Sequence, residues 1–191
     1  METVKVFIRA VRRAGLDFRM SQGFHPQPRL NFATPLPVGT ASRDEYAELE
    51  LIGVTEAALV QTLLNDQLPA GFHIRAVEPL PPGRKRKLAR GARFRVEAED
   101  NLFDPSVAAT WRSRDYIPIT KKSKKGRRRI DLKPLLEDLL VLTPKVIELT
   151  LGSGPAGTVR PGLAAQALFD LEPDRLTEIE VTKLQTLFDE A

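Results

Sequence analysis

Hydrophobic and polar positions in the first part of the chain change from a helical pattern to an alternating one. Val4, Phe7, Ile8 and Val11 recur at the spacing of one helix face. Residues 45–53 alternate apolar and polar side chains, which is typical of a half-buried strand. Together these patterns predict a helix, two strands, a helix and a strand at residues 3–14, 29–33, 45–53, 55–71 and 72–80.

A linker separates this part from a second series of strands and helices. Residues 79–92, PLPPGRKRKLARGA, hold three prolines and two glycines, a composition typical of a linker. We therefore expect an N-terminal domain at residues 1–83 and a C-terminal domain at residues 84–191. Beyond the linker, the pattern predicts strands at 93–99, 116–120, 128–132, 145–152 and 176–188, and helices at 105–114, 132–140 and 163–171. The strands at 116–120 and 128–132 are expected to form a hairpin.

The order of these elements predicts an α+β fold. A ferredoxin-like unit, a split βαβ arrangement, has the order βαββαβ. The first half follows this order without its initial strand, and the second half follows it with one extra helix. We expect two ferredoxin-like halves with antiparallel sheets.

Composition excludes several kinds of site. The 191 residues include no cysteine and two histidines, so the chain alone forms no disulfide, cysteine-ligated zinc site, iron–sulfur cluster or histidine-rich metal site. No run of about 18 apolar residues predicts a membrane span, and the N-terminus lacks the apolar core of a secretory signal. We expect a cytoplasmic protein that binds no metal or cofactor itself.

The net charge of +4 conceals an uneven distribution. Residues 84–93 hold six basic side chains and residues 121–129 hold seven, with no acidic residue in either segment. Such concentrated charge indicates a phosphate-binding surface; a solvated linker and hairpin tip are the alternative. The candidate nucleic-acid-binding residues are Arg84, Lys85, Arg86, Lys87, Arg90, Lys121, Lys122, Lys124, Lys125, Arg127, Arg128 and Arg129.

The segment SQGFHPQPRLNFATPLPVG, residues 21–39, leaves three interpretations open. Phe24 and His25 could stack on nucleobases while Arg29 binds a phosphate. His25 could instead act as a general base, although no partner with the required chemistry is evident. In the third interpretation the segment is a structural turn in which Phe24 fills the core.

Two further groups carry weaker signals. The first group is the carboxylates Asp44, Glu45, Glu48 and Glu50. Glu48 and Glu50 share a strand face and could hold Mg²⁺ with substrate phosphates, but a solvent-facing strand explains the row better. The glycine-rich turn GSGPAGTVRPG, with Arg160, could bind phosphate ahead of a helix, but an ordinary strand-to-helix turn explains it better.

Several motifs resemble one bacterial family. The helix motif RAVRRAGL is followed by SQGFHPQP, FATPLPVG and EYAELEL, and more loosely by IDLKP and GTVRP. This series resembles the radical-SAM-linked protein family, a domain of unknown function. The family pattern carries over to Ser21, Gly23, Phe24, His25, Pro26, Pro28, Arg29, Glu45 and Arg160, with no role assigned. The strand that usually precedes the first helix in that family is expected to be absent here.

The resemblance implies a partner, because the family's domain is often encoded beside a radical SAM enzyme or fused to one. The partner would carry the iron–sulfur cluster and the S-adenosylmethionine. We expect a non-catalytic RNA-binding accessory domain that presents tRNA, rRNA or a ribosomal substrate to that enzyme. The alternatives are an RNA-modifying enzyme of pseudouridine-synthase-like architecture and a protein-docking module for the radical SAM enzyme. Nothing in the sequence favours DNA or a membrane as a partner.

Overall fold

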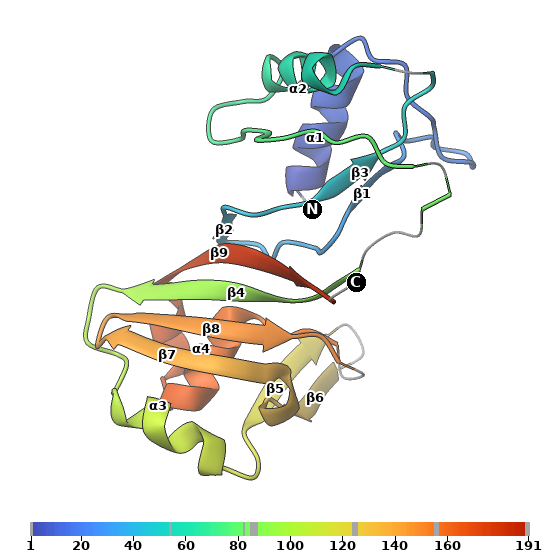
Figure 1. Ribbon diagram of the computed structural model, residues 1–191. Helices are drawn as coiled ribbons and strands as arrows, with labels where there is room; N and C mark the ends of the chain where they lie inside the picture. Colours follow the sequence, from blue (N-terminus) through green and yellow to red (C-terminus); the bar gives the residue numbers. More distant parts are fainter. Residues whose placement is uncertain are drawn as a thin grey trace. The chain divides into compact units, whose positions relative to one another are not determined.

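The chain forms two units, each with a hydrophobic core of its own (Figure 1). The computed structural model describes residues 2–53, 55–81, 83–84, 88–123, 126–154 and 157–189. Unit 1 consists of Met1–Leu36 and Tyr46–Lys87, and unit 2 of Pro37–Glu45 and Leu88–Ala191. The chain therefore enters unit 2 briefly before it returns to complete unit 1. The expected domains at residues 1–83 and 84–191 stay a prediction.

Unit 1 packs two helices around a small core. Its elements are α1 (Glu2–Arg13), β1 (Leu30–Phe32), β3 (Ala47–Leu49) and α2 (Ala57–Asn65). The buried core consists of Val11, Ala14, Leu16, Val60 and Leu64, so the apolar faces of α1 and α2 meet there. Strands β1 and β3 pair antiparallel, with Leu30 opposite Leu49. The helix and strand patterns predicted for these segments are confirmed.

The expected strand at residues 72–80 is wrong: the structure has no strand there. Side chains of α2 bind the backbone of this segment instead. The Asn65 amide accepts a hydrogen bond from the Ile74 N–H (2.8 Å) and donates to the Ile74 carbonyl (3.0 Å). The Gln61 amide donates to the carbonyls of Ile74 and Arg75. These amides replace strand pairing, while partly buried Ile74 and Val77 still pack on the core.

Unit 2 is built on a five-stranded sheet. Its strands are β2 (Thr40–Ser42), β9 (Ile179–Phe188), β4 (Ala89–Ala98), β8 (Val146–Gly152) and β7 (Leu136–Thr143), in that spatial order. All neighbouring pairs are antiparallel except β2 and β9, which are parallel. The fold is therefore α+β, with antiparallel and mixed sheets.

One helix covers the apolar face of this sheet. Helix α4 (Pro161–Phe169) buries Ala164, Ala165 and Leu168 in one cluster with Val96 of β4 and Leu149 of β8. Figure 1 shows α4 behind the sheet and α3 (Ser106–Thr110) at its lower end. The remaining described helices are short 3-10 turns: η1 (Trp111–Ser113), η2 (Lys133–Leu135) and η3 (Pro173–Thr177).

The expected helix at residues 132–140 is also wrong, because most of it is strand β7. Leu136 and Leu139 are both buried, and their spacing of three imitates a helix face. The register shift between Leu136 and Asp138 produces this spacing, since a bulge adds one residue before the pattern resumes.

A second antiparallel pair is inserted between η1 and η2. Strands β5 (Pro118–Ser123) and β6 (Gly126–Asp131) form the hairpin that the sequence predicts. Ile119 and Ile130 lie opposite each other, are buried, and join the core of unit 2. Their burial ties the base of the hairpin to the unit.

Candidate functional site

The Gly-Phe-His-Pro segment forms a loop whose two ends are tied together. The N–H of Ser21 donates to the carbonyl of Gln27 (2.8 Å), and the N–H of Gln27 donates to Ser21 Oγ (3.0 Å). Met20 and Pro28 form an isolated antiparallel bridge just outside this pair. The neck of the loop is thus closed, and Pro28 is buried beneath it.

The tip of this loop projects into solvent. The Phe24 side chain is fully exposed, at 101%, and His25 and Pro26 are exposed as well. Gly23 has a φ of +123°, a conformation that residues with a side chain rarely adopt. The interpretation in which Phe24 fills the core is therefore wrong. Within the described part of the chain, His25 has no hydrogen-bonded carboxylate that would orient it as a general base.

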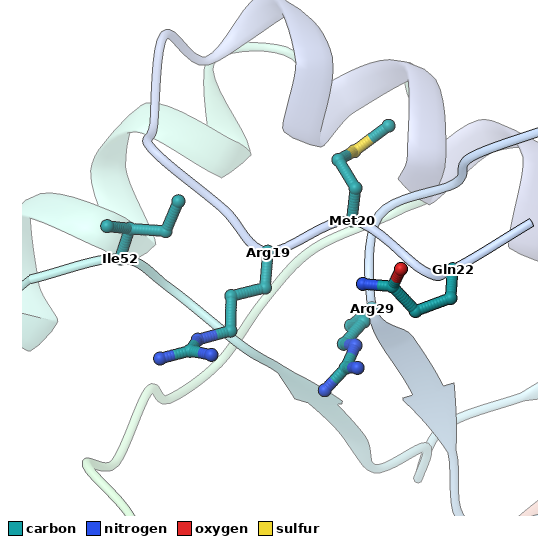
Figure 2. Close-up of a pocket in the computed structure, with 5 residues that line it drawn as sticks. All are labelled: Arg19, Met20, Gln22, Arg29 and Ile52. Atoms are coloured by element: carbon teal, nitrogen blue, oxygen red, sulfur yellow. The ribbon is translucent and has the colours of Figure 1, made fainter.

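An open hollow of about 460 Å³ lies beside the loop (Figure 2). Arg19, Met20, Gln22, Arg29 and Ile52 line it. In Figure 2, the side chains of Arg19 and Arg29 extend to the same side of the backbone. Arg29 donates to Glu50 Oε2 at 3.0 Å, which neutralises its charge, whereas Arg19 has no ion-pair partner among the described residues. The hollow therefore retains one uncompensated guanidinium.

The basic hairpin formed by β5 and β6 is the second feature. Arg127, Arg128 and Arg129 are exposed, and none of them pairs with an acidic side chain in the described part of the molecule. Lys121 lies opposite Arg128 in the register. Burial first, and the charge of Arg128 second, lower the pKa of Lys121 below its ordinary value. Arg127, Arg128 and Arg129 thus concentrate positive charge without acidic compensation from the described residues, which suits a polyanion.

The other members of the two basic segments differ in their surroundings. Arg84 is exposed, whereas Arg90 donates twice to Glu137, at 2.6 and 2.7 Å. Arg90 is therefore held in an ion pair. Lys122 belongs to strand β5, and only its backbone is described. Lys85, Arg86, Lys87, Lys124 and Lys125 lie outside the described residues.

The glycine-rich turn lies next to the hairpin. A Cβ added to Gly157 would be 3.7 Å from Lys121 Nζ, so the two segments that the sequence singled out separately are neighbours. Arg160 is exposed and occupies the N-cap of α4, where its side chain makes no capping hydrogen bond. The turn connects β8 to α4, as the simpler interpretation expected.

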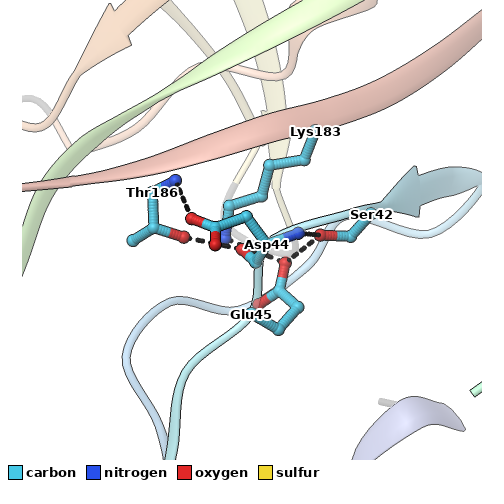
Figure 3. A network of polar contacts seen from close by, with 5 residues as sticks. All are labelled: Ser42, Asp44, Glu45, Lys183 and Thr186. Atoms are coloured by element: carbon cyan, nitrogen blue, oxygen red, sulfur yellow. Dashed lines mark hydrogen bonds and ion pairs between the residues drawn. The ribbon is translucent and has the colours of Figure 1, made fainter. Parts of the chain in front are cut away.

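Glu45 belongs to a polar network within unit 2 (Figure 3). Its Oε1 lies 2.8 Å from Lys183 Nζ and accepts a hydrogen bond from the Ser42 hydroxyl at 2.7 Å. Asp44 accepts from the Thr186 N–H through its side chain and from the Thr186 hydroxyl through its carbonyl, both at 2.7 Å. Lys183 is buried, with 2% exposure. The network fastens residues 42–45 to strand β9, so Glu45 has a structural role.

No metal site is formed by the described residues. Among them, no group of three or more histidine, aspartate or glutamate side chains is placed to hold an ion. Of the carboxylates in the row at residues 44–50, Glu50 is paired with Arg29 and Glu45 with Lys183. None of the described helices is long and apolar enough to cross a membrane.

The sequence analysis did not single out three residues that line the hollow or form the polar network. Arg19 and Ile52 line the hollow but belong to no motif, and only their separate positions beside the loop and strand β3 bring them together. Lys183 carried a signal that went unused, since it follows Ile179 and Val181 at the next alternate position of its strand, where another apolar side chain is expected. A charged residue in such a pattern indicates a buried partner.

Comparison with known proteins identifies a family but no individual relative. No curated protein matches the chain, and no solved structure matches it. The model of a bacterial family, described as "uncharacterized protein conserved in bacteria (DUF2344)", matches residues 1–161. The expected bacterial domain of unknown function is therefore confirmed. Because the match covers most of the sequence, the chain belongs to the DUF2344 family of proteins conserved in bacteria.

Proposed function

We propose that this protein is a non-catalytic RNA-binding accessory domain that presents an RNA or a ribosomal substrate to a radical SAM enzyme. The observation that carries the proposal is the basic hairpin. Arg127, Arg128 and Arg129 are exposed and lack acidic partners among the described residues. RNA is a dense polyanion, so neutralising its phosphates releases counterions and favours binding by such a surface.

The lowered pKa of Lys121 supports the same proposal. Burial is the larger cause of this shift, and the charge of Arg128, which disfavours the charged form of Lys121, is the second cause. A phosphate bound between the two side chains would offset the repulsion. Neighbouring cations of this kind suit a bound anion.

The topology of unit 2 supports its assignment as a ferredoxin-like unit. Strands β4, β7, β8 and β9 take the spatial order β9-β4-β8-β7 with every pair antiparallel. Helices α3 and α4 lie in the connections where the βαββαβ plan requires them. In this assignment the basic hairpin is an insertion between α3 and the second strand. The described part of unit 1 contains a single two-stranded sheet, which gives no comparable support.

The radical SAM partner follows from the resemblance of the N-terminal motifs. The chain has no cysteine, so the iron–sulfur cluster and the bound S-adenosylmethionine would belong to the partner. In this proposal the partner enzyme carries out the reaction, and this chain binds the RNA.

A salt series with a hairpin variant tests the proposed function. In R127Q/R128Q/R129Q, we expect weaker binding to total bacterial RNA and a flatter dependence of log K on log salt. The slope should fall by about 0.7 to 0.9 for each phosphate that the variant no longer neutralises. Electrophoretic mobility shifts at several salt concentrations measure both quantities.

The matched control removes three positive charges that already have oxygen partners in unit 2. Arg112 pairs with Asp138, Arg175 with Asp100, and Lys145 donates to the Glu99 carbonyl. The variant R112Q/K145Q/R175Q has the same net charge as the hairpin variant and should keep most of the RNA affinity. An equal loss of RNA affinity in both variants would show that binding depends on the overall positive charge and not on the hairpin. If the protein binds no RNA but retains a protein partner after nuclease treatment, the proposal is wrong and the chain is a protein-docking module.

A further inference from the structure

We propose that the loop formed by residues 20–29 of unit 1 is a separate RNA contact that captures one unpaired base. The base would stack on the Phe24 ring, and an adjoining phosphate would bind Arg19 at the hollow. This inference rests on the proposed RNA-binding function, and it adds a ligand class: single-stranded RNA. It uses residues of unit 1, whereas the basic hairpin belongs to unit 2.

The exposure of Phe24 is the first argument. The side chain is 101% exposed, and the ring makes no aromatic contact with a described residue. Both faces of an aromatic ring at a loop tip are therefore in water, which is unfavourable for an apolar group. A nucleobase that covers one face removes that area from water and adds stacking, and every base has such a face.

The rigidity of the loop is the second argument. Its neck is closed by the two hydrogen bonds between Ser21 and Gln27. Arg12 Nη2 donates to Gln27 Oε1 at 3.1 Å, which ties the loop to α1. Pro26 restricts the backbone directly after the tip. A tip that is already ordered loses little conformational freedom when a ligand binds, so the exposed ring suits recognition.

The charge around the loop selects the ligand. Residues 3–29 hold six basic side chains and one acidic side chain, Asp17. Arg29 is paired with Glu50, which leaves Arg19 as the guanidinium at the hollow without an ion pair among the described residues. Phe24 follows Arg19 by five residues in the chain, and an exposed aromatic ring together with an available guanidinium is the combination that binds a base and its phosphate. An apolar pocket of a protein would require no such cation.

The geometry also selects single strands. In an A-form duplex the bases are stacked on one another, and the deep, narrow major groove excludes side chains. A single projecting ring cannot enter that stack without opening base pairs. The loop should therefore bind an unpaired strand more tightly than a duplex of the same length. The basic hairpin binds phosphates, which both forms of RNA carry, so we expect no such preference from it.

Phe24 variants of the full chain test this inference against two labelled RNAs. The probes are fluorescein-labelled oligouridine of about twelve nucleotides and an RNA duplex of equal length, and fluorescence anisotropy gives the affinities. F24A should weaken binding to oligouridine by roughly fivefold to a hundredfold, F24W should retain it, and F24L should behave like F24A. R19Q should weaken it less and flatten its salt dependence. Duplex binding should stay within about twofold in all four variants.

The control variant is L59A, which removes another exposed apolar side chain of unit 1 and should leave both affinities unchanged. If F24A binds oligouridine like the wild type while the hairpin variant does not, the inference is overturned and the proposed function stands. If F24L binds like the wild type, the ring is an apolar anchor without stacking, which favours a protein pocket and overturns the inference as well. If the wild-type protein binds neither RNA, the proposed function fails, and this inference fails with it.

Discussion

Lys183 shows how one buried charge fixes a segment that comes from far away in the sequence. The side chain is 2% exposed, and its ammonium lies 2.8 Å from Glu45, whose side chain is 20% exposed. Removing a charge from water costs several kcal/mol, and an ion pair with further hydrogen bonds offsets that cost. The Ser42 hydroxyl supplies such a bond to Glu45. The pair therefore makes the attachment of residues 42–45 to β9 specific.

Breaking this pair should destabilise the protein more than breaking an exposed one. E45Q removes the carboxylate charge from a largely buried ion pair, so the free energy of unfolding should fall by about 3 kcal/mol. E50Q makes the same chemical change in the exposed pair with Arg29 and should cost less than about 1 kcal/mol. Urea unfolding followed by circular dichroism measures both. Equal losses in the two variants would show that burial does not set the strength of the Lys183 pair.

Secondary-structure elements were predictable where one period runs through a whole segment. Helix α1 and the strands of the basic hairpin follow the patterns read from the sequence. Strand β7 differs from its predicted helix, because its bulge places Leu136 and Leu139 at helical spacing on one face. Residues 72–80 do not form the predicted strand, because two amides of α2 bind backbone groups that a strand partner would bind. An irregular strand register overrides the local pattern in the first case, and side-chain contacts from α2 override it in the second.

Strand β4 contains a glycine whose lack of a side chain is required. A Cβ on Gly91 would lie 2.5 Å from the Leu151 carbonyl oxygen and 3.0 Å from Gly152 Cα in the adjoining strand β8. Both neighbours are backbone, so G91A must separate the strands and should cost about 3 kcal/mol or more. In G162A, the nearest atom is the end of the flexible Ile179 side chain, at 3.2 Å. That variant should stay within about 1 kcal/mol of the wild type, because alanine also favours the helix. Thermal unfolding of both compares them, and a stable G91A would show that the strands can part at little cost.

At the scale of the whole molecule, each unit carries its own cationic feature. The sequence singled out the Gly-Phe-His-Pro motif and the hairpin cations, and the structure exposes the tip of the motif and Arg127, Arg128 and Arg129. It could not indicate that Arg19 and Ile52 share a hollow with Arg29, because that arrangement depends on how the loop passes beside β3. Nor could it separate Arg90, which is paired with Glu137, from the hairpin arginines at 127–129, which have no acidic partner among the described residues. Charged residues can be counted from a sequence, whereas the fold decides which of them lie close enough to form ion pairs.

Photo-crosslinking to RNA that contains 4-thiouridine tests the central claim most directly. We predict crosslinks in two peptides of the wild-type protein, one from the basic hairpin and one from the loop at residues 20–29. Their yield should fall as salt rises, since phosphate binding weakens with ionic strength. In R127Q/R128Q/R129Q the hairpin crosslinks should disappear. Crosslinks no stronger than those of an unrelated protein, or unchanged in the hairpin variant, would contradict the account of this protein as an RNA-binding domain.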